Sequence, residues 1–377
     1  MNPAYDIAII GAGAMGSAAT YHLSDSGLKI LVLDKFTPPH AFGSSHGQTR
    51  IIREAYFENP LYVPLVQQAY VLWDKLASAS GKKLFLKTGG LMLGHKDQKV
   101  FSGAAHSAQQ FGIACDLLDQ AQLQRQFPVM KTDASTVALL EKNAGVLFPE
   151  ECIRAQLQLS ANPFVDFHFH EPVVTLESKG DVVTIHTTQS TYTTRKVIIS
   201  NGAWITDLLP ALQLPLQVKR QVLFWFACNA AAASQFQHGR FPVFIREYEA
   251  GKMFYGFPDL GNGIKIAIHH RGQLTTADDL QRHVDAKEIQ AITELVNYYF
   301  NATLTCINAT ACMYTNTPDE HFIIDYHPDH KNIILVSACS GHGFKFSSAI
   351  GKILREMAME EPLSFDVTPF RLNRNFT

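Results

Sequence analysis

The chain has 377 residues, too many for one ordinary core, so we expect two domains. Its residues are 46% hydrophobic and 18% charged, a composition typical of a soluble globular protein. Its net charge of −2 gives no electrostatic reason to bind nucleic acid or an anionic membrane, and no apolar run approaches the roughly 20 residues of a membrane span. The N-terminus lacks the basic segment of a signal peptide and the six cysteines form no Cys-x-x-Cys pair, so we expect a cytoplasmic protein with reduced thiols and no metal site.

The N-terminal segment predicts a βαβ unit that binds a dinucleotide. An apolar run at 5–10 leads into Gly11, Gly13 and Gly16, and a second apolar run ends at Asp34. Gly11 allows the tight turn, Gly13 lets a diphosphate approach the backbone, and Gly16 lets the helix pack closely on the strand. Asp34 can accept hydrogen bonds from ribose hydroxyls, and its charge argues against an NADP-type ligand. The motif does not separate FAD from NAD.

Short segments in which apolar residues recur at regular spacing follow the βαβ unit. The spacing predicts a loop over 36–47, helices over 61–76 and 152–159, and a strand over 90–94. Three apolar runs predict a β-meander that returns to the nucleotide-binding sheet, at 173–176, 182–186 and 197–200.

A different pattern begins near residue 221. Alternating runs predict a larger antiparallel sheet with a helix over it, the strands at 221–228, 243–246, 253–257 and 264–269 and the helix at 286–300. A strand at 332–338, a turn and a helix at 345–359 are expected to rejoin the first domain. The elements therefore predict an α/β nucleotide-binding domain with an inserted antiparallel α+β domain. We expect 1–86, 150–215 and 319–377 in the first domain, and 87–149 and 216–318 in the second.

Four separated motifs occur in one order, at 40–53 (His-Ala-Phe-Gly-Ser-Ser-His-Gly-Gln-Thr-Arg-Ile-Ile-Arg), 311–315, 319–325 and 340–347. Together they resemble the monomeric sarcosine oxidase family over almost the full chain. Residues 365–374 look most like the N-methyltryptophan oxidase branch, whereas other stretches look equally like sarcosine oxidase. The resemblance implies a Rossmann-like FAD-binding domain of the glutathione-reductase type.

The same resemblance implies an activity. It is the oxidation of an N-methyl amino acid, N-methyl-L-tryptophan or sarcosine, by O2, with hydride transfer from the N-methyl carbon to flavin N5. The products would be hydrogen peroxide and an imine that hydrolyses to formaldehyde and the demethylated amino acid. A monomer is expected. Two alternatives stay open: another flavin oxidase or dehydrogenase on this fold, acting on glycine, D-amino acids or pipecolate, and a flavin-binding protein without turnover.

The resemblance also assigns roles to basic residues. Arg53 and Lys345 would hold the substrate carboxylate, a task that suits the planar fork of arginine; the plainer interpretation is a surface salt bridge. Arg50 would lie over the flavin ring with His46, favouring the reduced anion. Arg50 and Arg53 share one face if this stretch is helical. Without the motif, His46 would be a loop histidine with local hydrogen bonds.

Cys312 matches the cysteine that forms a thioether to the flavin 8α-methyl group, although a free cysteine is commonly a small buried hydrophobe. Lys265 interrupts an apolar alternating strand and shares one face with His269. By resemblance Lys265 activates O2, since a fixed cation stabilises developing superoxide; the alternative is a solvent-facing lysine.

Further positions complete the predicted site. The resemblance places Tyr255, His269 and Tyr314 in the substrate pocket, where they would favour the neutral amine. The alternative is that these three side chains only pack in the protein core with their polar atoms hydrogen-bonded. The cofactor would contact residues of all the motifs: Gly11, Gly13, Gly16, Asp34, Ser44, His46, Arg50, Cys312, Gly341, Gly343, Phe344 and Lys345. Two positions depart from the family pattern, because Ser45 precedes His46 where a second histidine is common and Gln48 replaces an acid.

Overall fold

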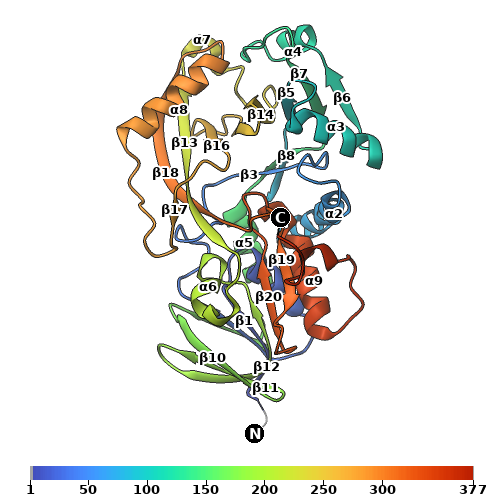
Figure 1. Cartoon of the computed structure of the whole chain (residues 1–377), viewed down its shortest axis with the longest axis vertical. Coiled ribbons are helices and arrows are strands. Elements are labelled where there is room, and N and C mark those ends of the chain that lie inside the picture. Colours follow the sequence, from blue (N-terminus) through green and yellow to red (C-terminus); the bar gives the residue numbers. More distant parts are fainter. Residues whose placement is uncertain (1–2, 377) are drawn as a thin grey trace.

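The computed structural model describes residues 3–376 and stacks two sheet-based layers one above the other (Figure 1). Within these residues the chain forms an eight-stranded sheet, here the first sheet, and a nine-stranded sheet, here the second sheet. A three-stranded sheet of β3 (Arg50–Ile52), β8 (Gly145–Leu147) and β4 (Phe85–Lys87) lies between them. No helix of the described chain is long and apolar enough to cross a membrane.

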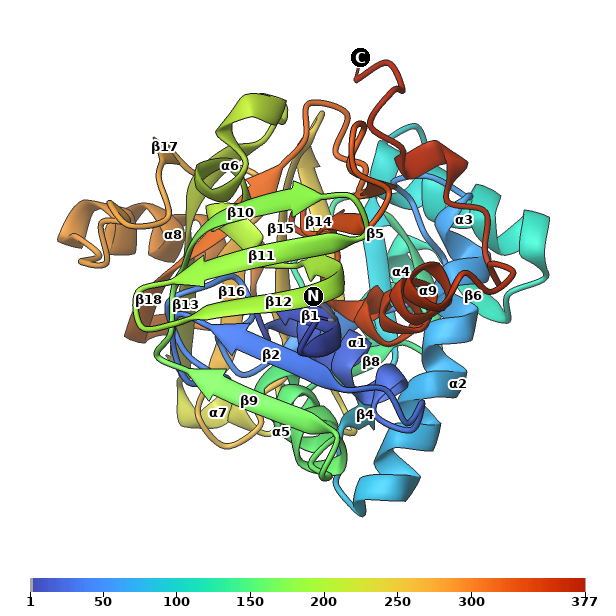
Figure 2. The same ribbon diagram turned by 90° about the horizontal axis from the view of Figure 1, so that it is seen from below.

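The first sheet has a parallel centre. β1 pairs in parallel with β2 and with β12, and β9 and β20 extend the parallel pairing on the two sides. β10 and β11 add an antiparallel meander to β12, and Figure 2 shows these strands side by side. The strands are β1 (Tyr5–Ile10), β2 (Ile30–Asp34), β9 (Val165–Phe169), β10 (Val173–Lys179), β11 (Val182–Thr187), β12 (Thr191–Ile199), β19 (Ile323–Tyr326) and β20 (Ile333–Ser337).

Helices cover the first sheet because its central strands are apolar on both faces. All five residues of β2 are buried. The helices that pack here are α1 (Ala14–Leu23), α2 (Tyr62–Ser80), α5 (Pro149–Leu159), α6 (Ile205–Leu208) and α9 (Ser347–Met359). α1 and α9 approach closely at Gly351, where a Cβ atom would lie 2.5 Å from Ala18. The predicted return of the C-terminal strand and helix to the first sheet is confirmed, since β20 pairs with β12.

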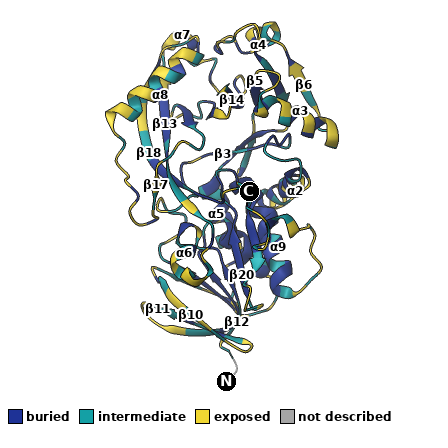
Figure 3. Ribbon diagram, in the orientation of Figure 1, coloured by how far each residue is buried: buried dark blue, intermediate teal, exposed yellow. Residues whose placement is uncertain are grey.

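The second sheet is mostly antiparallel, with one parallel pair between β14 and β5. Figure 3 shows its inner strands β5 and β14 largely buried, whereas β6 and the outer faces of the covering helices are exposed. The strands are β5 (Gly90–Gly94), β6 (Cys115–Leu118), β7 (Val137–Glu141), β13 (Gln217–Cys228), β14 (Val243–Glu249), β15 (Lys252–Phe257), β16 (Ile264–Ile268), β17 (Leu274–Thr275) and β18 (Leu304–Asn316). The helices are α3 (Lys99–Phe111), α4 (Gln120–Gln126), α7 (Ala230–Ala233) and α8 (Ala286–Tyr299).

Local chemistry sets the ends of these elements. The Asp285 carboxylate accepts the Glu288 N–H at 2.9 Å and Glu288 accepts the Asp285 N–H at 3.1 Å, a capping box that starts α8. Pro149 opens α5, where its missing N–H costs nothing. An N-cap side chain such as Asp285 stabilises its helix by ~1 kcal/mol.

Most predicted elements are confirmed, and the differences have local causes. β13 begins at Gln217, four residues before the predicted run, because it pairs with β18 along its whole length. β18 escaped prediction since its Asn and Thr residues interrupt the apolar alternation. The C-terminal helix starts as a 3-10 turn at Phe344–Phe346 before α9 begins. We propose that the two sheets mark two domains with the boundaries given above.

Candidate active site

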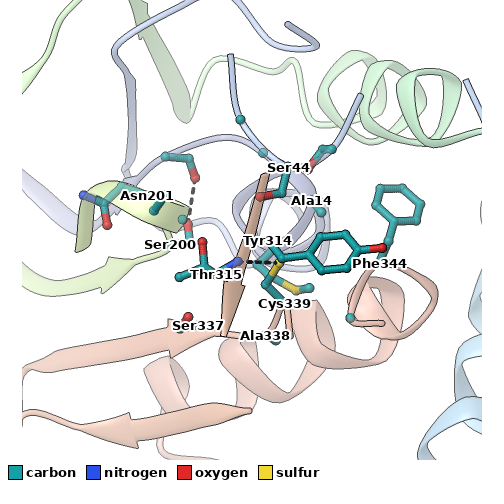
Figure 4. Close-up of a pocket in the computed structure, with 18 of the residues that line it drawn as sticks. Ala14, Ser44, Ser200, Asn201, Tyr314, Thr315, Ser337, Ala338, Cys339 and Phe344 are labelled. Atoms are coloured by element: carbon teal, nitrogen blue, oxygen red, sulfur yellow. Dashed lines mark hydrogen bonds between the residues drawn. The ribbon is translucent and has the colours of Figure 1, made fainter. Parts of the chain in front are cut away.

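One cavity of about 410 Å³ lies where the two sheets meet. Its wall combines the glycine turn after β1, the loop before β3, strands of the second sheet and the turn after β20. Figure 4 shows Ser200 and Asn201 on one side of it and Tyr314, Cys339 and Phe344 on the other. The Thr315 N–H reaches the Cys339 Sγ at 3.4 Å there.

The glycine turn leaves room at one end of the cavity. Gly11 has φ +88, and a Cβ there would lie 2.6 Å from the Asn201 Cα. A Cβ on Gly16 would lie 1.8 Å from the Gly11 carbonyl oxygen, so Gly16 serves helix packing and stands behind the wall. Gly13 lines the cavity, and a Cβ there would contact only the Ser45 Oγ, at 3.8 Å, among the described residues.

Asp34 ends β2 on the cavity wall, as predicted. Its Oδ2 accepts the Ala12 N–H at 2.7 Å and its Oδ1 accepts the Phe36 N–H at 2.8 Å. A carboxylate has about four lone-pair positions, so Asp34 keeps capacity to accept a ribose hydroxyl.

Arg50 begins β3, so the helical spacing considered for Arg50 and Arg53 is wrong. Both residues nevertheless line the cavity. The Arg50 guanidinium donates to three carbonyls of its own loop, those of Ser44 at 2.7 Å, His46 at 2.6 Å and Thr49 at 2.8 Å. Ser44 itself is part of the wall. The loop thereby fixes a cation at the cavity surface.

The His46 ring lies behind this wall. It is 7% exposed, and its Nε2 has no hydrogen-bond partner among the described residues. Burial, and then the charge of Arg50, lower the pKa of His46 to about 3, so the imidazole is neutral at ordinary pH. The hydrogen bond from Arg50 goes to the backbone carbonyl of His46.

Lys265 is buried at 2% exposure, so the solvent-facing interpretation is wrong. Its ammonium donates to the Gly47 carbonyl at 2.6 Å and to the carbonyl and hydroxyl of Thr49 at 3.1 and 3.0 Å. Burial, followed by the charge of Arg50, holds the pKa of Lys265 well below its usual value. Lys265 therefore lies one layer behind the wall, across the 47–49 turn from the cavity.

Arg53 and Lys345 are both buried on the wall, at 2% and 5% exposure, so a surface salt bridge is excluded. The Arg53 Nη2 donates to both oxygens of Glu58 at 2.7 and 2.5 Å, and its Nη1 donates to the Ala55 carbonyl at 2.8 Å. Burial, and next the charge of Arg53, lower the pKa of Lys345 to about 7. The Arg53 Nε has no partner among the residues described.

Three uncharged side chains lie between the basic groups. The hydroxyls of Tyr255 and Tyr314 are 3.3 Å apart, and the Tyr314 hydroxyl is 3.5 Å from the His269 Nδ1. Burial raises the pKa of both tyrosines and holds the pKa of His269 well below its usual value. All three line the cavity as predicted, and all are neutral at ordinary pH.

Cys312 lies on β18 in the wall, at 1% exposure. Burial raises the pKa of its thiol, and the nearby Arg50 charge opposes that rise. Gly341, Gly343 and Phe344 close the wall after β20. A Cβ on Gly343 would lie 1.8 Å from the Ala338 carbonyl oxygen, and one on Gly341 would lie 2.6 Å from the Tyr314 ring.

Sequence reasoning missed several residues of this site. Glu58 and Tyr56 follow Arg53 by a few positions, His342 lies inside the fourth motif, and Glu150 opens α5 and accepts the N–H groups of 47–48. The motif position of His342 was a usable signal. Glu58 lies on the cavity wall, whereas Tyr56 and Glu150 are not part of it, and only the closed fold reveals the contacts of all three.

The wall fits FAD. The turn at Gly13 is open, and the buried Asn201 Oδ1 and Thr315 Oγ1 line the cavity without a hydrogen-bond partner in residues 3–376. A family model described as FAD dependent oxidoreductase matches residues 6–357. The chain is therefore a FAD-dependent oxidoreductase.

Relatives define the group more narrowly. The chain is 39% identical over 365 residues to monomeric sarcosine oxidase of Streptomyces avermitilis, covering 95% of this chain and 94% of that protein. It is 37% identical to N-methyl-L-tryptophan oxidase of Citrobacter koseri, covering 98% and 99%. The chain belongs to the family of monomeric sarcosine and N-methyl-L-tryptophan oxidases, amine oxidases that act on CH–NH bonds.

Solved structures show the same fold. The amino acid oxidase NikD, essential for nikkomycin biosynthesis, superposes with a TM-score of 0.85 at 19% identity, covering 97% of each chain. Glycine oxidase from Geobacillus kaustophilus gives 0.82 at 17% identity, covering 98% and 99%. At these identities the likeness concerns the fold alone.

Proposed function

We propose that the protein oxidises an N-methyl amino acid, N-methyl-L-tryptophan or sarcosine, with O2. The observation that carries this proposal is the pair of buried cations, Arg53 and Lys345, on the wall of the cavity. Two buried positive charges next to one carboxylate, Glu58, favour an anionic ligand group such as the carboxylate of an amino acid. The names of the relatives agree with such a substrate.

The reaction balances without a further reactant. FAD, when bound to this wall, would supply the two-electron redox chemistry that links the substrate to O2. The N-methyl amine loses two hydrogens to become an imine, and water converts the imine into formaldehyde and the primary amino acid. The amine, O2 and one water thus become the amino acid, formaldehyde and hydrogen peroxide.

The side chains of the wall would prepare this step. Arg53 and Lys345 hold the carboxylate and so fix the N-methyl group. The uncharged Tyr255, Tyr314 and His269 favour the neutral amine, whose lone pair assists loss of the C–H bond. Because their pKa values are displaced away from neutrality, none of them is assigned as a base.

Other residues would act on the cofactor and on O2. We assign the ribose to Asp34, the diphosphate to the turn at Gly13, and a covalent thioether to Cys312. Arg50, supported from behind by His46, would stabilise negative charge on the reduced cofactor, and Lys265 would favour the reaction with O2. A monomeric state and a cytoplasmic location also remain predictions.

The test is the visible absorbance of the purified protein, mixed without air with N-methyl-L-tryptophan and, separately, with sarcosine. Bleaching by one of them, with peroxide and formaldehyde formed when air is admitted, is the expected result and identifies the substrate. Bleaching only by glycine, a D-amino acid or pipecolate would replace this substrate assignment. No bleaching by any amine would indicate a flavin-binding protein without turnover.

A further inference from the structure

Lys345 is held by hydrogen bonds to both its backbone and its side chain. Its backbone carbonyl accepts the Trp73 Nε1–H at 2.9 Å, which ties the 3-10 turn to α2. Its ammonium donates to the His342 carbonyl at 2.6 Å and to the Tyr56 hydroxyl at 3.3 Å. Tyr56 comes from the loop after β3, so two distant segments meet at this one nitrogen.

The hydrogen bonds beyond Tyr56 have a fixed direction. The His342 Nε2 lies 3.0 Å from the Glu320 carbonyl, which can only accept, so Nε2 carries the proton. The His342 Nδ1 is then an acceptor, and the Tyr56 hydroxyl, 2.6 Å away, donates to it. With its proton directed at His342, the Tyr56 oxygen presents its lone pairs to Lys345. In this series of hydrogen bonds, which runs from Lys345 through Tyr56 to His342, each donor lies on the side nearer the ammonium and each acceptor on the side farther from it.

The His342 ring is suited to this one tautomer. It is 8% exposed and stacks on Phe322 with ring centroids 4.9 Å apart. Burial lowers the pKa of His342 to about 3, so the ring stays neutral wherever the enzyme would work. A neutral ring with an occupied Nε2 can only accept at Nδ1.

We propose that Tyr56 and His342 form a positioning pair that holds the Lys345 ammonium for the substrate carboxylate. The inference rests on the proposed function, because it needs a carboxylate at Lys345. An ammonium has three N–H donors, and two are committed to Tyr56 and His342. The single remaining N–H then has a defined direction, which a flexible lysine otherwise lacks.

The pair also supports the charge of Lys345. The charged or titratable groups that face this ammonium are Arg53 and Glu58 on the loop after β3, Arg50 on β3, His269 after β16, and Tyr56 and His342 themselves. The two arginines disfavour the protonated ammonium, and Glu58 favours it. The Tyr56 oxygen is a further acceptor for the charged form, so its loss should make Lys345 easier to deprotonate.

The test compares Tyr56→Phe with Tyr62→Phe in the FAD-loaded enzyme. Tyr62 is a suitable control, since it is buried and packs on Tyr56 and His342, and its hydroxyl is hydrogen-bonded to the His321 Nδ1 at 2.8 Å and not to Lys345. The probe is propionate, whose Kd is measured by calorimetry from pH 5.5 to 9. Propionamide, which lacks the charge, checks that binding depends on the carboxylate.

We expect the pH above which propionate binding weakens to fall by about one unit in Tyr56→Phe and to stay unchanged in Tyr62→Phe. At pH 8 this makes the Tyr56→Phe affinity about tenfold weaker, while at pH 5.5 the two variants differ by less than about threefold. In His342→Asn the amide oxygen can still accept a hydrogen bond from Tyr56. The pH above which this variant loses propionate affinity should therefore lie between the values for Tyr56→Phe and the unaltered enzyme.

If the propionate affinity of Tyr56→Phe and that of Tyr62→Phe depend on pH in the same way, the proposal that Tyr56 and His342 position Lys345 is wrong. A loss of affinity that has the same size in both variants at all pH values would also overturn it, because that result describes general disturbance of the wall. If the unaltered enzyme does not bind propionate, the carboxylate site and the pair fall together. The loss of visible flavin absorbance on adding substrate without air then decides separately whether the oxidase proposal stands.

Discussion

Replacing Lys265 by methionine tests whether a buried cation serves O2 chemistry or only the fold. Methionine keeps most of the volume of the side chain and removes its charge. In the structure the ammonium is 2% exposed and has the Gly47 carbonyl and the carbonyl and hydroxyl of Thr49 as hydrogen-bond partners. Its ring neighbours are Phe257 and Trp225, with centroids 4.8 and 5.6 Å away.

The effect on stability should be small because two terms oppose each other. The variant no longer buries an ammonium, which relieves a desolvation cost of several kcal/mol. It leaves the Gly47 carbonyl without this donor, at a cost of about 1–3 kcal/mol, whereas the Thr49 carbonyl keeps its bond from Arg50 at 2.8 Å. We therefore expect the free energy of unfolding to change by less than about 2 kcal/mol.

The effect on turnover should be large and confined to one half of the reaction. Removing one fixed donor from a site of developing negative charge slows a reaction by about 10²–10³-fold. Stopped-flow absorbance should show normal anaerobic bleaching by substrate and reoxidation by O2 slower by that factor. Lys252→Met, on the exposed side of β15, is the matched control. Unchanged reoxidation, or an equal loss in both half-reactions, would refute the role of Lys265.

Three further predictions concern the wall of the cavity and the 47–49 turn behind it. Cys312→Ser should release flavin into the supernatant on acid precipitation, whereas the unaltered protein should keep it; flavin released equally from both would contradict the thioether. Because the pKa of Lys345 is about 7 and the protonated form binds the carboxylate, propionate affinity should be constant below pH 7 and fall about tenfold per pH unit above it; a flat profile to pH 9 would show that Lys345 stays charged. Glu150→Gln removes the charge from a carboxylate that accepts two N–H groups at 2.8 and 3.0 Å, so it should lower the unfolding free energy by about 1–2 kcal/mol in urea titration. Glu151→Gln, at a half-exposed neighbour paired with Arg154 on the surface, should change that free energy by less than about 0.5 kcal/mol.

The sequence predicted best those parts of the site that depend on neighbouring residues. The glycine turn and the acid at the end of β2 lie within one βαβ unit, where spacing alone fixes the geometry. Burial of Lys265 could not be read from its strand, because alternation places it on a polar face whether that face meets solvent or the 47–49 turn. The Tyr56–His342 contact joins residues 286 positions apart, so only the closed fold reveals it.

The basic groups of the cavity form two separate positive centres in a chain whose net charge is −2. Arg53 and Lys345 make one, beside Tyr56 and His342; Arg50 and Lys265 make the other, on the two sides of the 47–49 turn. Each cation except Arg53 is held by neutral oxygens and has no carboxylate within salt-bridge distance among the described residues.

Such burial opposes folding unless a ligand or the reaction supplies the missing negative charge. The groups between the centres, Tyr255, Tyr314 and His269, are neutral, so an anion at one centre need not neutralise the other. The arrangement therefore suits two different negative charges: a substrate carboxylate that is present from the start at Lys345, and charge that appears near Arg50 and Lys265 only as the reaction proceeds. A Lys345 variant should accordingly lose substrate affinity, and a Lys265 variant should lose the reaction with O2, each with little effect on the other property.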